Sequence, residues 1–589
     1  MFCRLPVLSV ILITVVAGGC ARQPATTVER LAVMPLENLS SDPQWDWFSR
    51  ASSALVQYDL AGAKNTFAQT VESLSAAQSM QASRVLEGYF FERNGRIGIR
   101  ATVEDFRNTR AVEHIEIEGP IAGGFLPVAN QLARRLSSGA RRFGTNNESA
   151  FRFYGEALGA SGAEASERAL KSATDADPGF AVSYLDQARL LEGTGARDRA
   201  LQAIQAGERG TQVDPIDRAD LQYVAAAASG DANARMQALE ALAQSEPSNA
   251  SLLVDLGQAQ FERRNFQAAA RNYQAATLLN PQEPRAWNSL GYALAWTRNL
   301  NGARQAIQEY EKLAPEQDAN ALDSLGEVSF YLSDFESAAK YFQQAAQKSP
   351  PELLKAAEAR LMTGDLREAD ALVARYSGPN ARGGNAGTDY RLAQWEYLTG
   401  RRTAGKARME TLARESSGDL QALALSQLAS WKLETGDRKA AIDLADQAVA
   451  HAQGPQARAV SAMCRHIASG STAPGSMMAD ALALLFAQKY QEALPLLQAA
   501  YERTNPSADG QVRVLLAWAR VETGGFAEAG KLLEICPLPL SSAEPMFASL
   551  IFPRYFALRA EVLEKQGKMD EAKKNRELYL KYAGGDATK

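Results

Sequence analysis

The chain has 589 residues, which is too long for a single hydrophobic core, so we expect two or more folded units. Apolar residues make up 46% of the sequence and charged residues 22%, a balance that excludes a chain disordered throughout. The formal net charge is −5 and no run of Lys and Arg occurs, which argues against a nucleic-acid-binding protein.

The amino terminus has the pattern of an export signal. Residues 5–16 form an apolar run that is too short to cross a bilayer core of ~30 Å, and the small residues 17–19 precede Cys20. This pattern resembles a bacterial lipoprotein signal, which is cleaved directly before the cysteine. The resemblance implies that residues 1–19 are a signal peptide, that Cys20 carries lipid and that residues 20–28 form a tether. The alternative is a general secretory signal with an incidental cysteine.

The residue after the cysteine bears on the destination of the protein. Ala21 follows Cys20, whereas lipoproteins retained at an inner membrane commonly have Asp there. In a host with two membranes, the resemblance therefore implies the periplasmic face of the outer membrane. No other stretch reaches 18 consecutive apolar residues, so we expect no membrane-spanning helix in the mature chain.

Residues 29–143 have the alternating pattern of a small α/β domain. Asn94-Gly95 separates two β-rich runs and predicts a tight hairpin. The aromatic residues Trp45, Trp47 and Phe48 follow a loop and are expected on a helix. The expected strands cover 31–36, 84–92, 97–105 and 113–118, and a further helix is expected over 126–136.

Two segments of this domain carry a family resemblance. The segment RLAVMPLENLSSDPQWDWF, residues 30–48, resembles the opening of the amino-terminal domain of TolB-type proteins. Residues 85–113, VLEGYFFERNGRIGIRATVEDFRNTRAVE, resemble its second half. After Phe48 the family commonly continues ADGLTEEL, whereas this chain has SRASSALVQ. Such domains often accompany tetratricopeptide arrays in the extracytoplasmic regions of bacterial kinases and adenylate cyclases, so the resemblance implies association rather than chemistry.

From residue 146 the strand patterns end and a repeat begins. Alanines recur at intervals of 34 or 35 residues, at Ala165, Ala200, Ala234, Ala269, Ala303 and Ala338. A unit of about 34 residues is the length of the tetratricopeptide repeat, which is a helix–turn–helix. We therefore expect a mostly α protein: a tetratricopeptide-type α-solenoid of about eleven or twelve hairpins over 146–583, preceded by the small α/β domain and followed by a disordered tail over 584–589.

The match is fullest between residues 250 and 350. Leu256-Gly257, Leu290-Gly291 and Leu325-Gly326 place a small residue at the same point of three successive units. Small residues allow two helices to cross closely, and the prolines that close these units end the second helix.

No catalytic set stands out. The stretch Gly525–Lys531 approaches a phosphate-binding loop, but Leu532 stands where a Ser or Thr would hold magnesium. Ser337 and Lys340 match a short acylating motif, although the helical repeat accounts for both residues. None of the three histidines has a second ligand at metal spacing. We therefore expect no enzyme activity, no cofactor and no metal.

The inner groove of the array is the predicted binding surface. In tetratricopeptide arrays, side chains at fixed positions of each first helix face this groove. Here the resemblance selects Phe261, Arg285, Asn288, Tyr292, Trp296, Asp323, Glu327 and Tyr331, with Val254, Gln258, Asn320 and Phe330 beside them. Aromatic anchors mixed with amides and charges suit a peptide. The alternative is that Phe261, Phe330 and Trp296 only pack on the adjacent helix.

Together these observations favour a lipid-anchored scaffold of the cell envelope that binds a peptide or protein partner, and no nucleic acid. Two other functions stay open. One is a lipoprotein that binds a glycan or another small molecule, and the other is the sensory arm of a signalling system that has lost its kinase or cyclase domain.

Overall fold

The computed structural model describes residues 28–40, 42–106, 108–210, 213–313, 319–378, 386–470, 476–536 and 545–583. The expected signal peptide, Cys20, nearly all of the tether and the tail over 584–589 lie outside the described residues. The chain divides into two compact units, which are described separately. The first contains most residues up to Phe143, and the second contains the residues from Gly144 onward.

The first unit contains a mixed sheet in the order β3-β1-β4-β5-β6, with β2 also paired to β4. Its strands are β1 (Glu29–Val33), β2 (Glu37–Asn38), β3 (Thr66–Thr70), β4 (Arg84–Arg93), β5 (Arg96–Asp105) and β6 (Arg110–Pro120). β1 runs parallel to β3 and β4, whereas β4, β5 and β6 are antiparallel. At the β4–β5 turn, Asn94 and Gly95 both have left-handed backbones, with φ of 51° and 73°. This turn confirms the predicted hairpin.

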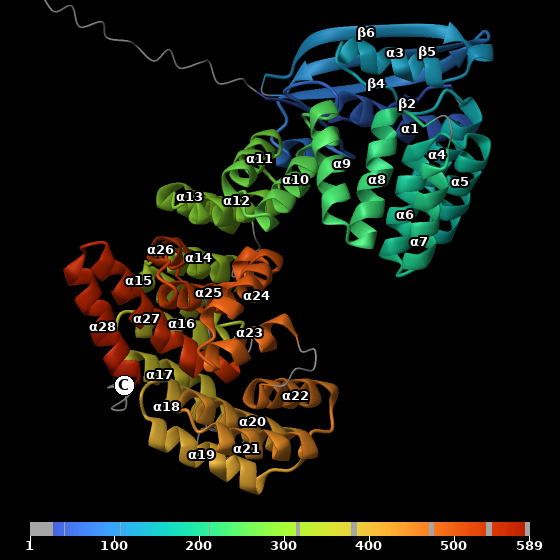
Figure 1. Cartoon of the computed structure of the whole chain (residues 1–589). Coiled ribbons are helices and arrows are strands. Elements are labelled where there is room, and N and C mark those ends of the chain that lie inside the picture. The colour runs from blue at the N-terminus through green and yellow to red at the C-terminus, as the bar shows by residue number, and fades with distance from the viewer. Residues whose placement is uncertain are drawn as a thin grey trace, which may run out of the picture. The chain divides into compact units, whose positions relative to one another are not determined.

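Helices α1 (Trp47–Leu60) and α3 (Leu126–Leu136) contact each other and the sheet, so they cover the same face (Figure 1). The remaining helical segments are η1 (Pro43–Trp45), α2 (Leu74–Ser79) and η2 (Ile121–Gly123). Phe48 joins α1 to the sheet, because its ring centroid lies 5.0 Å from that of Phe90 and 4.7 Å from that of Phe125. α3 has the predicted bounds. Strand β3 was missed, because its five residues are all half-buried and show no alternation.

The second unit is helical throughout its described residues. Its helices are α4 (Glu148–Gly159), α5 (Ala163–Ala176), α6 (Ala181–Gly193), α7 (Arg197–Glu208), α8 (Pro215–Ser229), α9 (Ala232–Ser245), α10 (Ala250–Glu262), α11 (Phe266–Leu279), α12 (Pro284–Trp296), α13 (Leu300–Leu313), α14 (Ala319–Tyr331), α15 (Phe335–Ala345), α16 (Glu352–Met362), α17 (Leu366–Ser377), α18 (Ala386–Leu398), α19 (Arg402–Glu415), α20 (Gly418–Glu434), α21 (Arg438–His451), α22 (Pro455–Ser469), α23 (Met477–Phe486), α24 (Tyr490–Arg503), α25 (Gly510–Glu522), α26 (Phe526–Leu532), α27 (Ala548–Lys565) and α28 (Met569–Ala583), with short 3-10 turns η4 (Pro506–Ala508) and η5 (Pro545–Phe547).

These described helices form twelve hairpins of neighbouring helices, and α22 is an additional single helix after α21 (Figure 1). The structure thus confirms the predicted fold class, a helical solenoid preceded by a small α/β unit. No helix in the described part of the chain is long and apolar enough to cross a membrane.

Glycine sets the distance between the two helices of the central hairpins. A Cβ atom on Gly257 would come within 2.7 Å of the Tyr273 ring, and one on Gly291 would meet Ile307. Gly326 has the same relation to Phe342. Real Cβ atoms do not approach other atoms so closely, so any larger residue would force the helices apart. The small residues that the repeat pattern selected are therefore required by packing.

The recurring alanines lie near the start of the second helix of each hairpin. Ala269, Ala303 and Ala338 are fully buried in the first turns of α11, α13 and α15. Ala234 also lies near the start of its helix, α9, but it is exposed, and Met236 and Leu239 are buried there instead. The alanine spacing thus located the helices correctly but did not identify the buried face of α9.

Contacts between hairpins show which helices line the inside of the curve. The first helices α10, α12 and α14 contact one another along the array, while the second helices α11 and α13 contact the first helices that follow them, α12 and α14. In a curved stack, elements on the inner side lie closer together than those on the outer side. The first helices of the hairpins therefore line the inner face.

The end of the chain folds back on the middle of the array. The turns between the two helices of four consecutive hairpins, from α10–α11 to α16–α17, and the last turn of α16 bond residues beyond position 500. The bonds are Arg264 to Asp509, Tyr501 O and Thr504 O; Arg298 to Glu534 O; Ser333 Oγ to Cys536 Sγ; Lys581 Nζ to Gly364 O; and Tyr582 OH to Leu361 O. A simple solenoid contacts only its neighbouring repeats, so this unit is partly closed.

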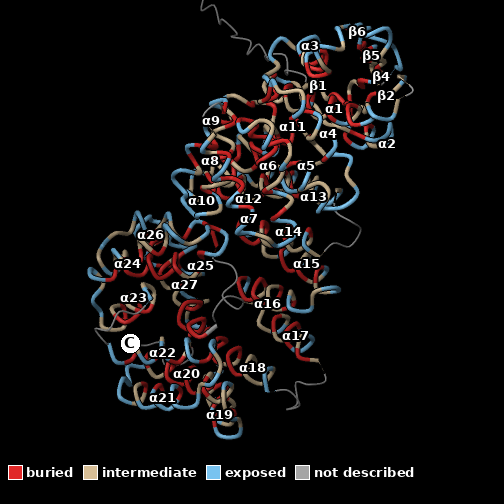
Figure 2. Tube along the Cα trace, turned by 90° about the vertical axis from the view of Figure 1, so that its right-hand side faces the viewer, coloured by how far each residue is buried: buried red, intermediate tan, exposed pale blue. Residues whose placement is uncertain are grey.

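Three helices of the second unit, α20, α25 and α27, are extensively buried. Ten of the 13 residues of α25 and 12 of the 18 residues of α27 are buried, and α20 is buried to a similar extent (Figure 2). Their sequences are apolar on nearly all sides, as in VRVLLAWARV of α25. A helix that is hydrophobic all round needs cover on every side, which the fold-back supplies.

The segment after Phe143 is attached to the helical unit. Asn147 caps α4 by accepting from the backbone N–H groups of Ser149 and Ala150, and its Nδ2 donates to Ala176 O at 2.9 Å. Thr145 Oγ1 donates to Asp177 at 2.5 Å. Residues 144–147 are therefore part of the first hairpin.

Candidate functional site

A series of polar side chains connects the first helices along the inner face. Tyr154 OH donates to Asp186 at 2.9 Å, Tyr223 OH donates to Asp255 at 2.8 Å, and Tyr292 OH donates to Glu327 at 2.6 Å. Each bond reaches from one first helix to the next, about one repeat further along the chain. We call this series, together with Arg285, Asp323 and Lys355, the inner polar ladder.

The ladder is most highly charged between α14 and α16. Lys355 Nζ lies 2.7 Å from Asp323, 3.1 Å from Glu327 and 3.1 Å from Glu352. Burial raises the pKa of Asp323 to about 6 and raises that of Glu327, although the ammonium opposes both shifts. Burial disfavours the charged form of Lys355, but its carboxylate partners outweigh this and raise its pKa. One cation shared by three carboxylates leaves this cluster with an excess of acceptors.

The aromatic candidates are packed inside the fold. Phe261, Trp296 and Tyr331 are 5%, 9% and 1% exposed. Their rings form a chain, with centroids 5.7 Å apart between Phe261 and Trp296 and 4.5 Å apart between Trp296 and Tyr331. The Arg513 guanidinium of α25 lies 6.0 Å from the Trp296 ring centre. The three rings are buried mainly against one another, and Arg513 is the α25 side chain beside Trp296, so these rings are not accessible to a partner.

The polar candidates are more accessible. Arg285 is exposed and forms a 3.2 Å ion pair with Asp255. Asn288, Tyr292, Asp323 and Glu327 are half-buried. The Asn288 Oδ1 atom is buried and accepts no hydrogen bond within the described part of the chain. The structure thus brings the polar candidates together on the inner face. They are half-buried or exposed, whereas the aromatic candidates Phe261, Trp296 and Tyr331 are buried.

A cavity that the sequence did not indicate lies among five helices further along the array. Its enclosed volume is about 50 Å³, within a wider space of about 600 Å³ that includes open solvent. Its lining comprises Leu354, Glu358, Val373, Tyr376, Ser377, Arg391, Leu392, Gln394, Trp395, Leu398, Gln427, Trp431, Ala548 and Ser549. These residues come from α16, α17, α18, α20 and α27 and share no local pattern, so sequence reasoning had no signal for them.

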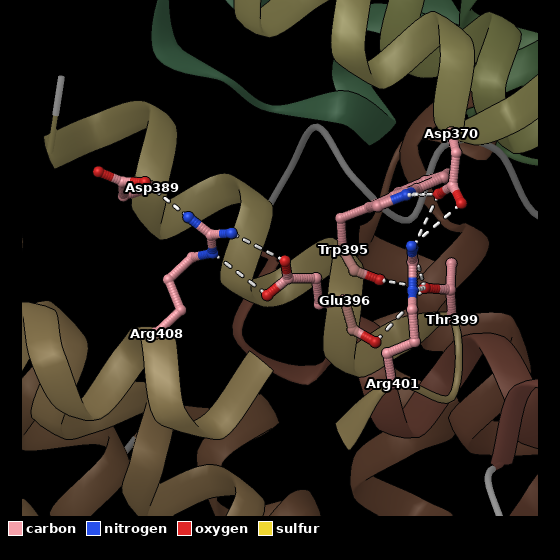
Figure 3. Close-up of polar contacts among 7 residues, drawn as sticks. All are labelled: Asp370, Asp389, Trp395, Glu396, Thr399, Arg401 and Arg408. Atoms are coloured by element: carbon pink, nitrogen blue, oxygen red, sulfur yellow. Dashed lines mark hydrogen bonds and ion pairs between the residues drawn. The ribbon is translucent and has the colours of Figure 1, made fainter. Parts of the chain in front are cut away.

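One wall of the cavity is held by a polar network. The Trp395 indole N–H donates to Asp370 at 2.8 Å, and Arg401 binds both oxygens of the same carboxylate at 2.7 and 3.0 Å (Figure 3). Arg401 also donates to Thr399 Oγ1 at 2.7 Å. A bidentate Arg–carboxylate pair has a defined geometry, so it orients Asp370 and through it the Trp395 ring.

A second arginine joins α18 to α19. Arg408 lies 2.8 Å from Asp389 and 2.9 Å from Glu396, and Figure 3 shows it between the two carboxylates. Its side chain thereby fixes both ends of α18 relative to α19. Among the described residues, no group of three or more His, Cys, Asp and Glu side chains is arranged to hold a metal ion.

Comparisons with known proteins support the repeat assignment locally. Residues 254–318 match the tetratricopeptide repeat family. No curated protein matches the chain. Similar solved structures include MamA, with 17% identity, 31% of this chain and 95% of that chain covered and a TM-score of 0.26. YrrB, described as a TPR protein with an unusual peptide-binding site, is 19% identical, with 31% of this chain and 94% of that chain covered and a TM-score of 0.27. Pseudomonas aeruginosa pilF is 16% identical, with 38% of this chain and 97% of that chain covered and a TM-score of 0.30.

The match begins within α10 and includes α11, α12 and α13, which is the part of the array where the glycine and alanine spacing is most regular. Residues 254–318 therefore carry tetratricopeptide repeats, within a helical unit that has the tetratricopeptide type of fold.

Proposed function

We propose that this chain is a non-enzymatic scaffold that binds a peptide or protein partner along the inner polar ladder. The observation that carries the proposal is the unpaired, buried Asn288 Oδ1 on the inner face of α12. A buried acceptor without a donor costs about 1–3 kcal/mol, and an amide N–H of an extended peptide would satisfy it. Arg285 lies one helical turn away and offers an exposed donor for a peptide carbonyl or carboxylate.

The proposed contact surface is polar. Because Phe261, Trp296 and Tyr331 are buried, affinity has to come from hydrogen bonds to Arg285, Asn288 and the carboxylates near Lys355. The excess of acceptors around Lys355 favours a partner segment with Lys or Arg side chains.

Site-specific photo-crosslinking tests this proposal. A photoreactive residue at position 285 should capture a partner in the native host, whereas the same residue at the exposed position 271 of α11 should not. Arg285→Ala and Asn288→Ala should then each weaken binding of that partner about fivefold or more. Equal capture at both positions, or unchanged affinity in the double variant, would place the function elsewhere.

We further propose that Cys20 carries the lipid anchor and that the protein lies in the cell envelope, on the periplasmic face of the outer membrane in a host with two membranes. The support is the small-residue run before Cys20 in the sequence. Mass spectrometry of the mature protein should find an acylated Cys20 at its amino terminus. Cys20→Ser should release the protein from the membrane fraction, and a mature chain starting at another residue would refute the proposal.

The proposal for the first unit rests on its resemblance to TolB-type amino-terminal domains. We propose that it contributes a second association surface. Deleting residues 29–143 behind the signal peptide should then remove a subset of the crosslinked partners, while capture at position 285 persists.

A further inference from the structure

The cavity among α16, α17, α18, α20 and α27 combines apolar walls with a defined polar end. Leu354, Val373, Leu392 and Leu398 supply aliphatic surface, and Trp395 and Trp431 supply aromatic faces. The polar end contains the carboxamides of Gln394 and Gln427, which are 9% and 1% exposed. Binding sites for small organic molecules typically have this composition, with few polar groups among apolar walls.

One backbone carbonyl determines how the oxygen and nitrogen atoms of the two carboxamides are oriented. Met546 O can only accept, and Gln427 Nε2 donates to it at 2.8 Å. Gln427 Oε1 must then point the other way, where it accepts from Gln394 Nε2 at 2.8 Å. This leaves Gln394 Oε1, a buried acceptor that has no hydrogen-bond partner among the described residues. A flip of either amide would place two like groups together, so the open acceptor is a consequence of the fold.

Most hydrogen-bond donors of the lining are already engaged. The indole N–H of Trp395 donates to Asp370, and that of Trp431 donates to Ser549 at 3.2 Å. Ser549 Oγ in turn donates to Glu434 at 2.7 Å, and Ser377 Oγ donates to Val373 O. The open acceptor is therefore best satisfied by a donor that enters from outside the protein.

Formal charges in the lining balance. Glu358 and Arg391 both border the cavity and carry opposite formal charges. A charged ligand would also lose its hydration among the leucine and tryptophan walls, at a cost that one hydrogen bond does not offset. The lining therefore favours a neutral molecule.

We propose that this cavity binds a small, neutral organic compound with an apolar ring or branched chain and one hydroxyl or N–H group that donates to Gln394 Oε1. The apolar part lies against Trp395 and Leu354, and the donor reaches the carboxamide end. The carboxamide end of this site, on α18 and α20, shares no residue with the inner polar ladder, so the proposed ligand is tested independently of the scaffold function.

A pair of ring compounds that differ in one donor tests the proposal. The probes are 4-fluorophenol and 4-fluoroanisole, titrated into the full-length chain and followed by fluorine NMR. The anisole is the more hydrophobic of the two, so apolar burial alone favours it. A hydrogen bond to Gln394 should reverse this order and make the phenol bind about three- to tenfold more tightly.

Three variants identify the site. Gln394→Met keeps the length of the side chain and removes the acceptor, so the preference for the phenol should disappear while the anisole still binds. Gln447→Met, on the exposed side of α21, is the matched control and should leave both affinities unchanged. Val373→Phe should fill the cavity and weaken both probes, with circular dichroism confirming the fold. Absence of saturable binding by either probe, or a phenol preference that survives Gln394→Met, would overturn the proposal.

Discussion

Asp509 is a buried charged residue of the fold-back that pairs with two arginines. It is fully buried and accepts from Arg264 at 2.6 Å and from Arg513 at 2.5 Å. Arg264 belongs to the α10–α11 turn and Arg513 to α25, so a single carboxylate joins segments about 245 residues apart. Both guanidinium groups lie largely away from water, with exposed side-chain fractions of 15% and 5%. Removing their shared partner would leave two buried cations uncompensated.

We therefore expect Asp509→Asn to destabilise the helical unit by about 3–5 kcal/mol. Urea denaturation followed by circular dichroism measures the change. Asp446→Asn is the control, because Asp446 pairs with Arg465 at the surface and exposed pairs contribute about 0–1 kcal/mol. Similar losses in both variants would show that the buried pair does not support the fold-back.

Glu434 makes the stability depend on pH. It is half-buried at the end of α20, where burial raises its pKa to about 7, although Arg402 and Arg554 oppose the rise. Between pH 4.5 and 7 the folded state holds a proton that the unfolded state has released, so stability falls as pH rises through this window.

Glu434→Gln does not titrate and still accepts from Ser549. From pH 5 to pH 8 the variant should gain about 1–2 kcal/mol over the wild type in urea denaturation. Parallel pH profiles would contradict the assignment.

Each hairpin depends on a close crossing of its two helices. Gly291 of α12 faces Ile307 of α13, and a Cβ at this position would lie 2.2 Å from the Ile307 Cδ1 atom. The repeat pattern of the sequence places a glycine here because the second helix leaves no room for a side chain.

Gly291→Ala should therefore destabilise the unit by about 1–3 kcal/mol, despite the higher helix propensity of alanine. Gly193→Ala in α6 is the opposite case, since nothing lies within 4 Å of its Cβ position. That change should be neutral or stabilise by up to about 1 kcal/mol. Thermal unfolding compares the two variants, and a loss in both would mean that crossing distance is not the cause.

At the scale of the whole molecule, the fold-back distinguishes the helical unit from an open solenoid. Tyr582 of α28 is fully buried, and its OH donates to Leu361 O of α16 at 2.7 Å. Its ring also lies 5.4 Å from that of Phe552. In an open solenoid, a change in the last hairpin would affect only the neighbouring repeats.

Tyr582→Ala should consequently raise amide hydrogen exchange in α16 and α17 about tenfold or more, although these helices precede it by more than two hundred residues. Exchange in α6 and α7 should not change and is the internal control. Hydrogen exchange with mass spectrometry resolves both regions. Unchanged exchange in α16 would indicate that the fold-back contributes little to its stability.

The sequence by itself determined the features that depend on local pattern. The Asn94-Gly95 hairpin, the bounds of α3 and the succession of helical hairpins all follow from residues within one repeat or one turn. Small residues at Gly257, Gly291 and Gly326 marked the helix crossings, because close packing imposes the same requirement in each unit. The positions of the inner-face candidates also followed from this spacing, and their binding role stays a prediction.

Only the tertiary structure decided which of those candidates a partner can reach. The position of Trp296 in its helix does not show whether the ring is exposed. In the structure it is buried against Phe261, Phe266 and Tyr331 of the neighbouring hairpins. The open acceptor of Gln394 likewise depends on Met546 O, about 150 residues later in the chain. Such contacts join residues that share no periodic relation, so a pattern read along the chain contains no signal for them.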